Sequence, residues 1–278
     1  MKKSVTAPGK HRKLIVMLVA AAVAAACLAF WGIKVACGEL EDIYERQCCV
    51  TDTGEQVEVV SGKVVPARLI TNHFCLTNGV NLARVPFASL RERLLKDMPN
   101  LQDVKISRRL PNFVRIEAVE RVPVVRVTGS GPKASSLAAD REGVVFWYPR
   151  RDTALLPVIR EAKKNTSSPG EILTGMALAA LHLLEEASAP EFSVLKIQEV
   201  DTFKQDYLFA TLGDSSRAKI AWEDMEKPTK SSRISLTNQL SRLSLAVKSS
   251  VAAGTKLWNA TDWGTPCRIY ANDPTKAE

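Results

Sequence analysis

The sequence predicts an α+β protein with a single N-terminal transmembrane helix and two folded parts. The first part has the order β-α-α-β-β, and the second is mostly antiparallel β structure with two packed helices. Three observations indicate this fold class: a long uncharged run near the N-terminus, an alternating pattern typical of a hairpin within residues 101–125, and two amphipathic helical patterns between short strand patterns in the second half.

The N-terminus has the pattern of a membrane anchor. Residues 1–13 contain five lysines or arginines and no acid, and residues 14–33 carry no charge at all. About 20 apolar helical residues span a hydrocarbon core of about 30 Å, so we predict a transmembrane helix over residues 14–34. The acidic segment that follows places the N-terminus in the cytoplasm. A signal peptide cleaved near Cys27 is the alternative, but the apolar run is longer than such peptides usually have.

The pattern of the first folded part centres on a hairpin. Apolar and polar residues alternate over 104–107 and again over 113–119, which is typical of strands with one buried face. Pro111 and Asn112 favour a reversal between them. Upstream, leucines at helical spacing predict an amphipathic helix over residues 86–98, bounded by prolines. A strand over residues 57–60 and a weaker helix over residues 66–74 complete the order.

Taken in order, the residues of this part resemble a POTRA domain, and in particular that of the FtsQ/DivIB family of bacterial cell-division proteins. The family has a turn that contains proline and a closing Glu-Arg-x-Pro, which Glu120, Arg121 and Pro123 match. The resemblance is carried by Asn81-Leu82, Leu90, Leu94, Pro99, Val104-Lys105-Ile106, Arg108-Arg109-Leu110-Pro111, Ile116, Glu120-Arg121 and Pro123-Val124.

The second folded part combines helices with short strands. Ser168 and Glu171 have the spacing of a capping box and predict a helix from there through Ala187. Leucines and valines at spacings of three and four predict another helix over residues 229–251. The turn Asp140-Arg141-Glu142-Gly143 resembles one in the second domain of the FtsQ/DivIB family. Strands are predicted over residues 122–127, 144–146, 156–159, 194–200, 207–212, 217–222, 256–261 and 266–271, with 194–222 as an antiparallel meander.

These elements give a domain organisation for the whole chain. The predicted parts are a basic cytoplasmic tail (1–13), the transmembrane helix (14–34), a linker (35–56), the POTRA domain (57–127), the FtsQ-type β-domain (128–272) and a tail (273–278).

The sequence has no pattern of a catalytic, cofactor or metal site. The three histidines, His11, His73 and His182, stand outside any paired spacing of metal ligands, and the serines lack a GxSxG motif. The net charge is +8, but five positive charges lie in the N-terminal tail, which argues against a nucleic-acid-binding fold. We therefore predict a protein that is not an enzyme and has no cofactor.

The cysteines leave two alternatives open. The chain has six, at positions 27, 37, 48, 49, 75 and 267, and none has CxxC spacing. Cys37 can bridge to Cys48 or Cys49, or the thiols can be free.

The resemblance implies a function as well as a fold. FtsQ-like proteins are scaffolds of the divisome in the bacterial inner membrane, whose periplasmic domain recruits FtsB and FtsL for septal peptidoglycan synthesis. Their C-terminal sheet edge binds the partner, because an edge strand has unpaired N–H and C=O groups. The alternative functions are an accessory of envelope protein transport or secretion, and an envelope enzyme. Carried onto this sequence, the candidate partner-binding residues are Arg268, Ile269, Tyr270, Trp258 and Trp263. The alternative is that the aromatic residues only cover the sheet, and for Trp258 we favour that interpretation.

Overall fold

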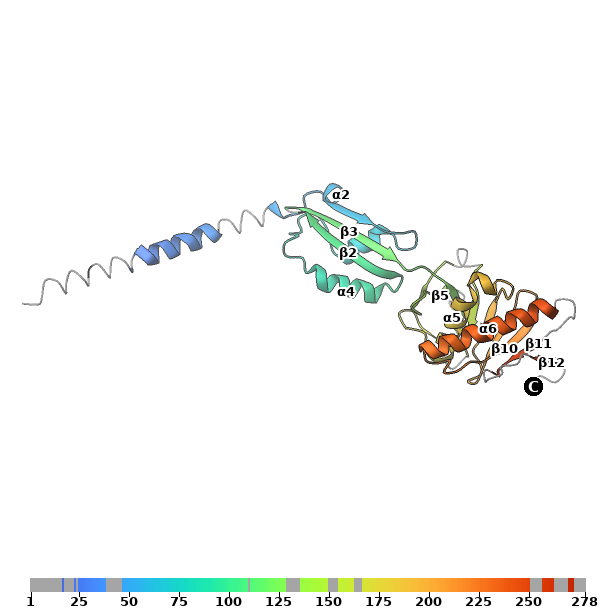
Figure 1. Cartoon of the computed structure of the whole chain (residues 1–278). Coiled ribbons are helices and arrows are strands. Elements are labelled where there is room, and N and C mark those ends of the chain that lie inside the picture. The colour runs from blue at the N-terminus through green and yellow to red at the C-terminus, as the bar shows by residue number, and fades with distance from the viewer. Residues whose placement is uncertain are drawn as a thin grey trace, which may run out of the picture. The chain divides into compact units, whose positions relative to one another are not determined.

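The protein is α+β, and its described residues form one three-stranded and one nine-stranded sheet (Figure 1). It divides into two compact units: the first comprises residues 1–59, 74–87 and 106–116, and the second comprises residues 60–73, 88–105 and 117–278. The predicted domain boundary between residues 127 and 128 stays a prediction. The computed structural model describes residues 17, 23, 25–38, 47–109, 111–128, 136–149, 155–162, 167–250, 257–262 and 270–272.

The N-terminal region requires a correction to the predicted fold class. Within the described residues, no helix combines the length and the apolar character needed to cross a membrane. This finding overturns the transmembrane helix predicted over residues 14–34. The continuous helical run described there covers residues 25–38, which is about 21 Å at about 1.5 Å per residue, against a hydrocarbon core of about 30 Å. Much of residues 14–24 lies outside the described residues.

The three-stranded sheet has the order β1-β3-β2 and contains the predicted hairpin. The predicted sequence of elements, β-α-α-β-β, is confirmed, and one short helix, α2, precedes it. In α2, Asp52 caps the first turn by accepting a hydrogen bond from the Gly54 N–H at 2.8 Å. The elements are α2 (Thr53–Gln56), β1 (Val57–Val60), α3 (Ala67–His73), α4 (Phe87–Asp97), β2 (Leu101–Arg109) and β3 (Phe113–Glu120).

Glu120, the first residue of the Glu-Arg-x-Pro motif, closes a turn far away in the sequence. Its carboxylate accepts hydrogen bonds from three backbone N–H groups, those of Lys63, Val64 and Val65, at 3.1, 2.9 and 2.6 Å. A Cβ at residue 62 would meet this carboxylate at less than 3 Å, so a side chain there would have to displace it from these donors. The motif therefore has a structural explanation within the second unit.

Arg121, the next residue of the motif, lies in a largely buried ion pair with Asp140. The side chains are 14% and 8% exposed, and Arg121 Nη1 lies 2.5 Å from Asp140 Oδ2. The other carboxylate oxygen of Asp140 accepts the N–H groups of Glu142 and Val144 at 3.1 and 2.9 Å. This interaction explains the Asp-x-x-Gly turn, where Gly143 adopts φ +80°. Both residues belong to the second unit.

The nine-stranded sheet has the order β12-β11-β10-β9-β8-β7-β4-β5-β6. Five of its eight strand pairs are antiparallel, as predicted for most of this sheet, and three are parallel: β4 with β7, β7 with β8 and β10 with β11. The predicted meander is confirmed as β8-β9-β10. The strands are β4 (Val125–Thr128), β5 (Leu137–Ala139), β6 (Val145–Trp147), β7 (Val158–Arg160), β8 (Glu199–Asp201), β9 (Leu208–Thr211), β10 (Arg217–Ile220), β11 (Leu257–Ala260) and β12 (Tyr270–Asn272).

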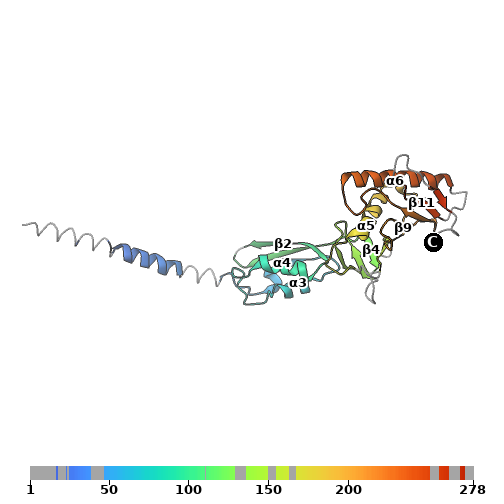
Figure 2. The same cartoon turned by 90° about the horizontal axis from the view of Figure 1, so that it is seen from below.

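Two helices, α5 (Gly175–Ala187) and α6 (Lys230–Ser250), pack against this sheet (Figures 1 and 2). Leucines of both helices share one core with alternate residues of the strands, so both cover the same face. Gln239 of α6 is 1% exposed and donates to the carbonyls of Ala221, Ala260 and Asp262 at 3.0, 3.0 and 3.2 Å. It therefore connects α6 to the ends of β10 and β11.

The predicted start of the first of these helices was wrong. Ser168 and Glu171 do form part of a capping box, since the Ser168 N–H donates to the Glu171 carboxylate at 2.7 Å. However, the helix begins only at Gly175. The intervening residues instead pair with the outer side of β6, where the Val145 N–H donates to the Glu171 carbonyl at 2.9 Å. Tertiary pairing has replaced the first helical turn.

The structure also decides the cysteine alternatives for the residues it describes. Cys27, Cys37, Cys48 and Cys75 are free thiols, so Cys37 forms no bridge. Cys267 lies outside the described residues.

Candidate edge-strand binding site

The two edges of the nine-stranded sheet differ in how they are covered. At the β6 edge, the segment 170–173 pairs with the strand: Gly170 N–H donates to the Val145 carbonyl at 2.8 Å, and Leu173 N–H donates to the Gly143 carbonyl at 2.8 Å. At the other edge, β12 pairs with β11 on one side, and no described strand lies on its other side. Within the described part of the chain, β12 is therefore the open edge of this sheet.

β12 contains one of the predicted partner-binding residues. It runs antiparallel to β11, with Tyr270 opposite Asn259, Ala271 opposite Trp258 and Asn272 opposite Leu257. Tyr270 thus lies on the open edge strand. Three other predicted residues, Trp263, Arg268 and Ile269, lie outside the described residues.

Trp258 belongs to the core rather than to the surface. It is 4% exposed and packs in the core cluster beneath the two helices. Its indole Nε1 is buried and has no hydrogen-bond partner among the described residues. An unsatisfied buried donor costs about 1–3 kcal/mol, so the apolar contacts of the ring must offset this cost. The side chain positions β11, the only strand that pairs with β12 in the described structure.

The face of the sheet opposite the two helices is polar and partly aromatic. Register places Arg160, Asp201, Phe209, Lys219, Asn259 and Tyr270 in one row across β7 to β12, in the order β7-β8-β9-β10-β11-β12.

The arginines of this face, Arg160 and Arg217, are paired with carboxylates, and two of its basic side chains contact aromatic rings. Asp201 is 7% exposed at its side chain and lies 2.8 Å from Arg217 Nη2. The Arg217 guanidinium lies 5.0 Å from the Phe209 ring centre, and the Lys219 ammonium lies 5.4 Å from the same ring. Such cation–π contacts contribute about 0.5–1 kcal/mol at exposed sites. They hold basic groups in place on the sheet face near the β12 edge.

The comparisons add no relative. No family model and no curated protein matches this sequence. The resemblance to the FtsQ/DivIB family therefore rests on the residues quoted above.

Sequence reasoning missed two features of the site. Arg217 and Lys219 belong to no sequence motif, and only the register of β10 against β9 brings them close to Phe209. The one sequence signal for their position was their alternation with the buried residues Ala218 and Ile220, which places both on the opposite face of the sheet. The covering of the β6 edge had no sequence signal, because the covering segment reads as the start of a helix. Among the described residues, no group of three or more His, Cys, Asp or Glu side chains could hold a metal ion.

Proposed function

We propose that this chain is a binding scaffold whose strand β12 accepts an extended segment of a partner protein. The observation that carries the proposal is the contrast between the two sheet edges: β6 is covered by backbone hydrogen bonds, whereas β12 has no neighbour on one side among the described residues. An edge strand with free N–H and C=O groups binds another chain by extending the sheet. The function proposed is that of a binding protein rather than of an enzyme.

The partner class comes from the resemblance to the FtsQ/DivIB family. It names FtsB-like and FtsL-like coiled-coil membrane proteins of the divisome, and it puts the folded part of this chain on the periplasmic side of the inner membrane. The chain would then recruit these partners for septal peptidoglycan synthesis. The Lys219 ammonium, which lies over the Tyr207 and Phe209 rings, favours a partner segment that carries acidic side chains.

Photocrosslinking in living cells tests the proposal. A photoreactive amino acid at Tyr270 should capture a small single-pass coiled-coil protein, identified by mass spectrometry. The matched control position is Trp147, which lies on the covered edge strand β6 and is 38% exposed. It should capture no such protein. Capture of a transport or secretion component from Tyr270 would instead favour the alternative function, and no capture there would contradict edge binding.

A pair of proline variants tests the mode of binding. Along an antiparallel edge strand, successive N–H groups point alternately to the neighbouring strand and away from it. Of Tyr270 and Ala271, one therefore directs its N–H outward, and proline removes that donor. We expect one of Tyr270→Pro and Ala271→Pro to fold normally and to lose co-purification of the partner protein, which needs no crosslinker at position 270. If both variants fold and both still co-purify the partner, pairing through β12 is refuted.

A further inference from the structure

The turn that joins β2 and β3 carries positive charge that the proposed function does not use. Two segments of the first unit, residues 74–87 and 106–116, contain four arginines and no aspartate or glutamate. Arg108 and Arg109 are the last two residues of β2, next to the turn, and both are exposed. The other two are Arg84 and Arg115. This part of the first unit is therefore basic.

Aromatic rings hold the two guanidiniums of β2 in place. That of Arg108 lies 4.4 Å from the ring centre of Phe87, and its Nη2 donates to the Val85 carbonyl at 3.3 Å. That of Arg109 lies 5.8 Å from the ring centre of Phe113. Such contacts orient a guanidinium but leave it positively charged. Both groups are thus ordered before any ligand binds.

Arg108 and Arg109 lack a carboxylate partner in the part of the chain that the structure describes. No ion pair joins either of them to a described aspartate or glutamate. Arg115 differs, since its Nη1 lies 3.3 Å from a carboxylate oxygen of Glu58. Two adjacent positive charges without a counter-ion repel each other, and an external anion relieves this repulsion.

The chemistry of the first unit indicates which anion this is. The planar fork of a guanidinium makes paired hydrogen bonds to a phosphate or a carboxylate. The helical run 25–38 belongs to the same unit, and its side chains Leu28, Phe30 and Trp31 are 69%, 71% and 67% exposed. Such side chains bind at the boundary between lipid headgroups and acyl chains, where tryptophan is enriched. A phospholipid surface offers phosphates together with an apolar layer, whereas a nucleic acid has no such layer.

We propose that the turn between β2 and β3 binds the phosphates of anionic phospholipids at a membrane surface, through Arg108 and Arg109. Each basic side chain near an anionic leaflet adds to the attraction, which falls off within about 10 Å. The two arginines therefore act only where the turn lies against the headgroups. Binding there sets the orientation of the first unit at the membrane, and it does not involve β12.

Vesicle flotation of the full-length chain tests this proposal. The probes are vesicles of phosphatidylcholine alone and vesicles that also contain phosphatidylglycerol, and the ratio of the two affinities measures the contribution of anionic lipid. The apolar side chains of residues 25–38 contribute to both affinities and cancel in the ratio. The double variant Arg108→Gln/Arg109→Gln should lower the ratio about thirtyfold, because it removes two charges at the headgroups. Arg108→Lys/Arg109→Lys keeps both charges and should lower it less.

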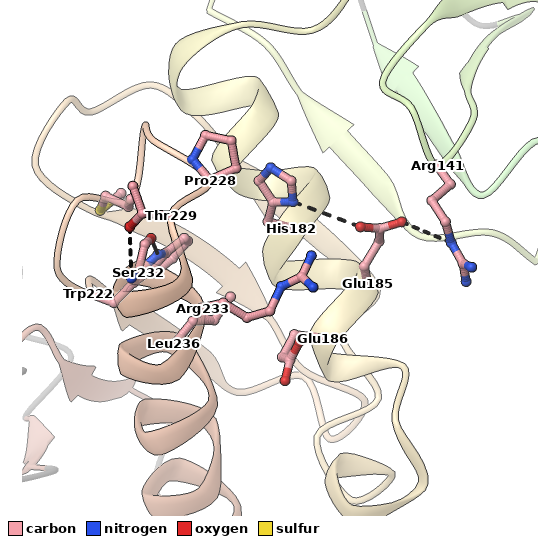
Figure 3. A pocket seen from close by; sticks show the side chains of 11 residues that line it. Arg141, His182, Glu185, Glu186, Trp222, Pro228, Thr229, Ser232, Arg233 and Leu236 are labelled. Atoms are coloured by element: carbon pink, nitrogen blue, oxygen red, sulfur yellow. Dashed lines mark hydrogen bonds and ion pairs between the residues drawn. The ribbon is translucent and has the colours of Figure 1, made fainter.

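The matched control removes two arginines from the second unit. Arg141 and Arg233 are both exposed and lie beside a cavity of about 290 Å³ between α5 and α6, which His182 also lines (Figure 3). Arg141→Gln/Arg233→Gln removes the same net charge and should lower the ratio less than about threefold, because salt screens distant charges. Equal losses in the two double variants would mean that net charge alone acts, which would overturn the proposal. An unchanged ratio in folded Arg108→Gln/Arg109→Gln would overturn it as well.

Photocrosslinking from the turn itself distinguishes lipid from protein. A photoreactive amino acid at Asn112 should become attached to phospholipid, both on vesicles that contain phosphatidylglycerol and in living cells. Attachment to an acidic protein or to a nucleic acid in cells, with no lipid attached, would refute binding to the membrane.

Discussion

Replacing Asp140 by alanine should destabilise the second unit far more than replacing an exposed member of a similar ion pair. Asp140 is 8% exposed at its side chain, and it holds both Arg121 and two backbone N–H groups. Removal of one partner from a buried pair leaves the other charge buried and uncompensated, which costs about 3–5 kcal/mol. Asp103 makes an ion pair with Arg91 of the same length, 2.5 Å, but its side chain is 38% exposed. Its replacement should cost about 0–1 kcal/mol.

Amide hydrogen exchange measures this difference in stability at the turn that Asp140 holds. The Val144 N–H donates to Asp140, so its exchange rate reports opening of the turn. A loss of about 3 kcal/mol corresponds to exchange that is more than a hundredfold faster, because each 1.4 kcal/mol is a factor of ten. Urea unfolding of Asp140→Ala and Asp103→Ala gives the global comparison. Equal losses in the two variants, or a loss below about 1 kcal/mol for Asp140→Ala, would refute the reasoning.

Three further predictions concern other buried contacts. Gly62→Ala should cost about 1–3 kcal/mol, because the new Cβ displaces the Glu120 carboxylate from its backbone donors; urea unfolding measures this, and an unchanged midpoint would contradict it. Burial raises the pKa of Glu161, so the stability that its protonation provides is complete below the unfolded pKa of about 4.5 and is lost as pH rises through the folded value. Glu161→Gln should therefore gain Tm relative to the unmodified chain as pH rises from about 4.5 through the folded pKa of Glu161, and a constant offset at every pH would count against it. Gln239→Leu removes the amide donor from the carbonyls of Ala221, Ala260 and Asp262, of which Ala260 keeps the Ala221 N–H, and should cost about 1–3 kcal/mol by the same unfolding assay; a neutral effect would mean that water replaces the amide.

Local patterns predicted the elements whose partners are near in sequence. The hairpin of β2 and β3 and the helix α4 were confirmed, because alternation and leucine spacing report directly which face is buried. The edge strand β12 could also be predicted from the sequence, because Tyr270 was expected to lie in a final strand.

Contacts between distant residues could not be read from the sequence. The residues around Ser168 have a helix-start pattern, but pairing with β6 held them extended. Gln239 looked like a polar residue on a helix, and only the tertiary structure places its amide on the ends of two strands. The cavity of His182 and Arg233 joins two helices that are about fifty residues apart, so no spacing rule applies to it.

The parallel pairing of β10 with β11 has a consequence for how the chain reaches its final form. Parallel neighbours require a crossover, and here the crossover contains the whole of α6. β11 joins the sheet when the chain closes the loop that contains α6, and β11 is the one described strand with which β12 pairs. Closing so long a loop is slow compared with forming a hairpin. We therefore expect the open edge strand β12 to form late in folding, which would limit its exposure to unintended partners during synthesis.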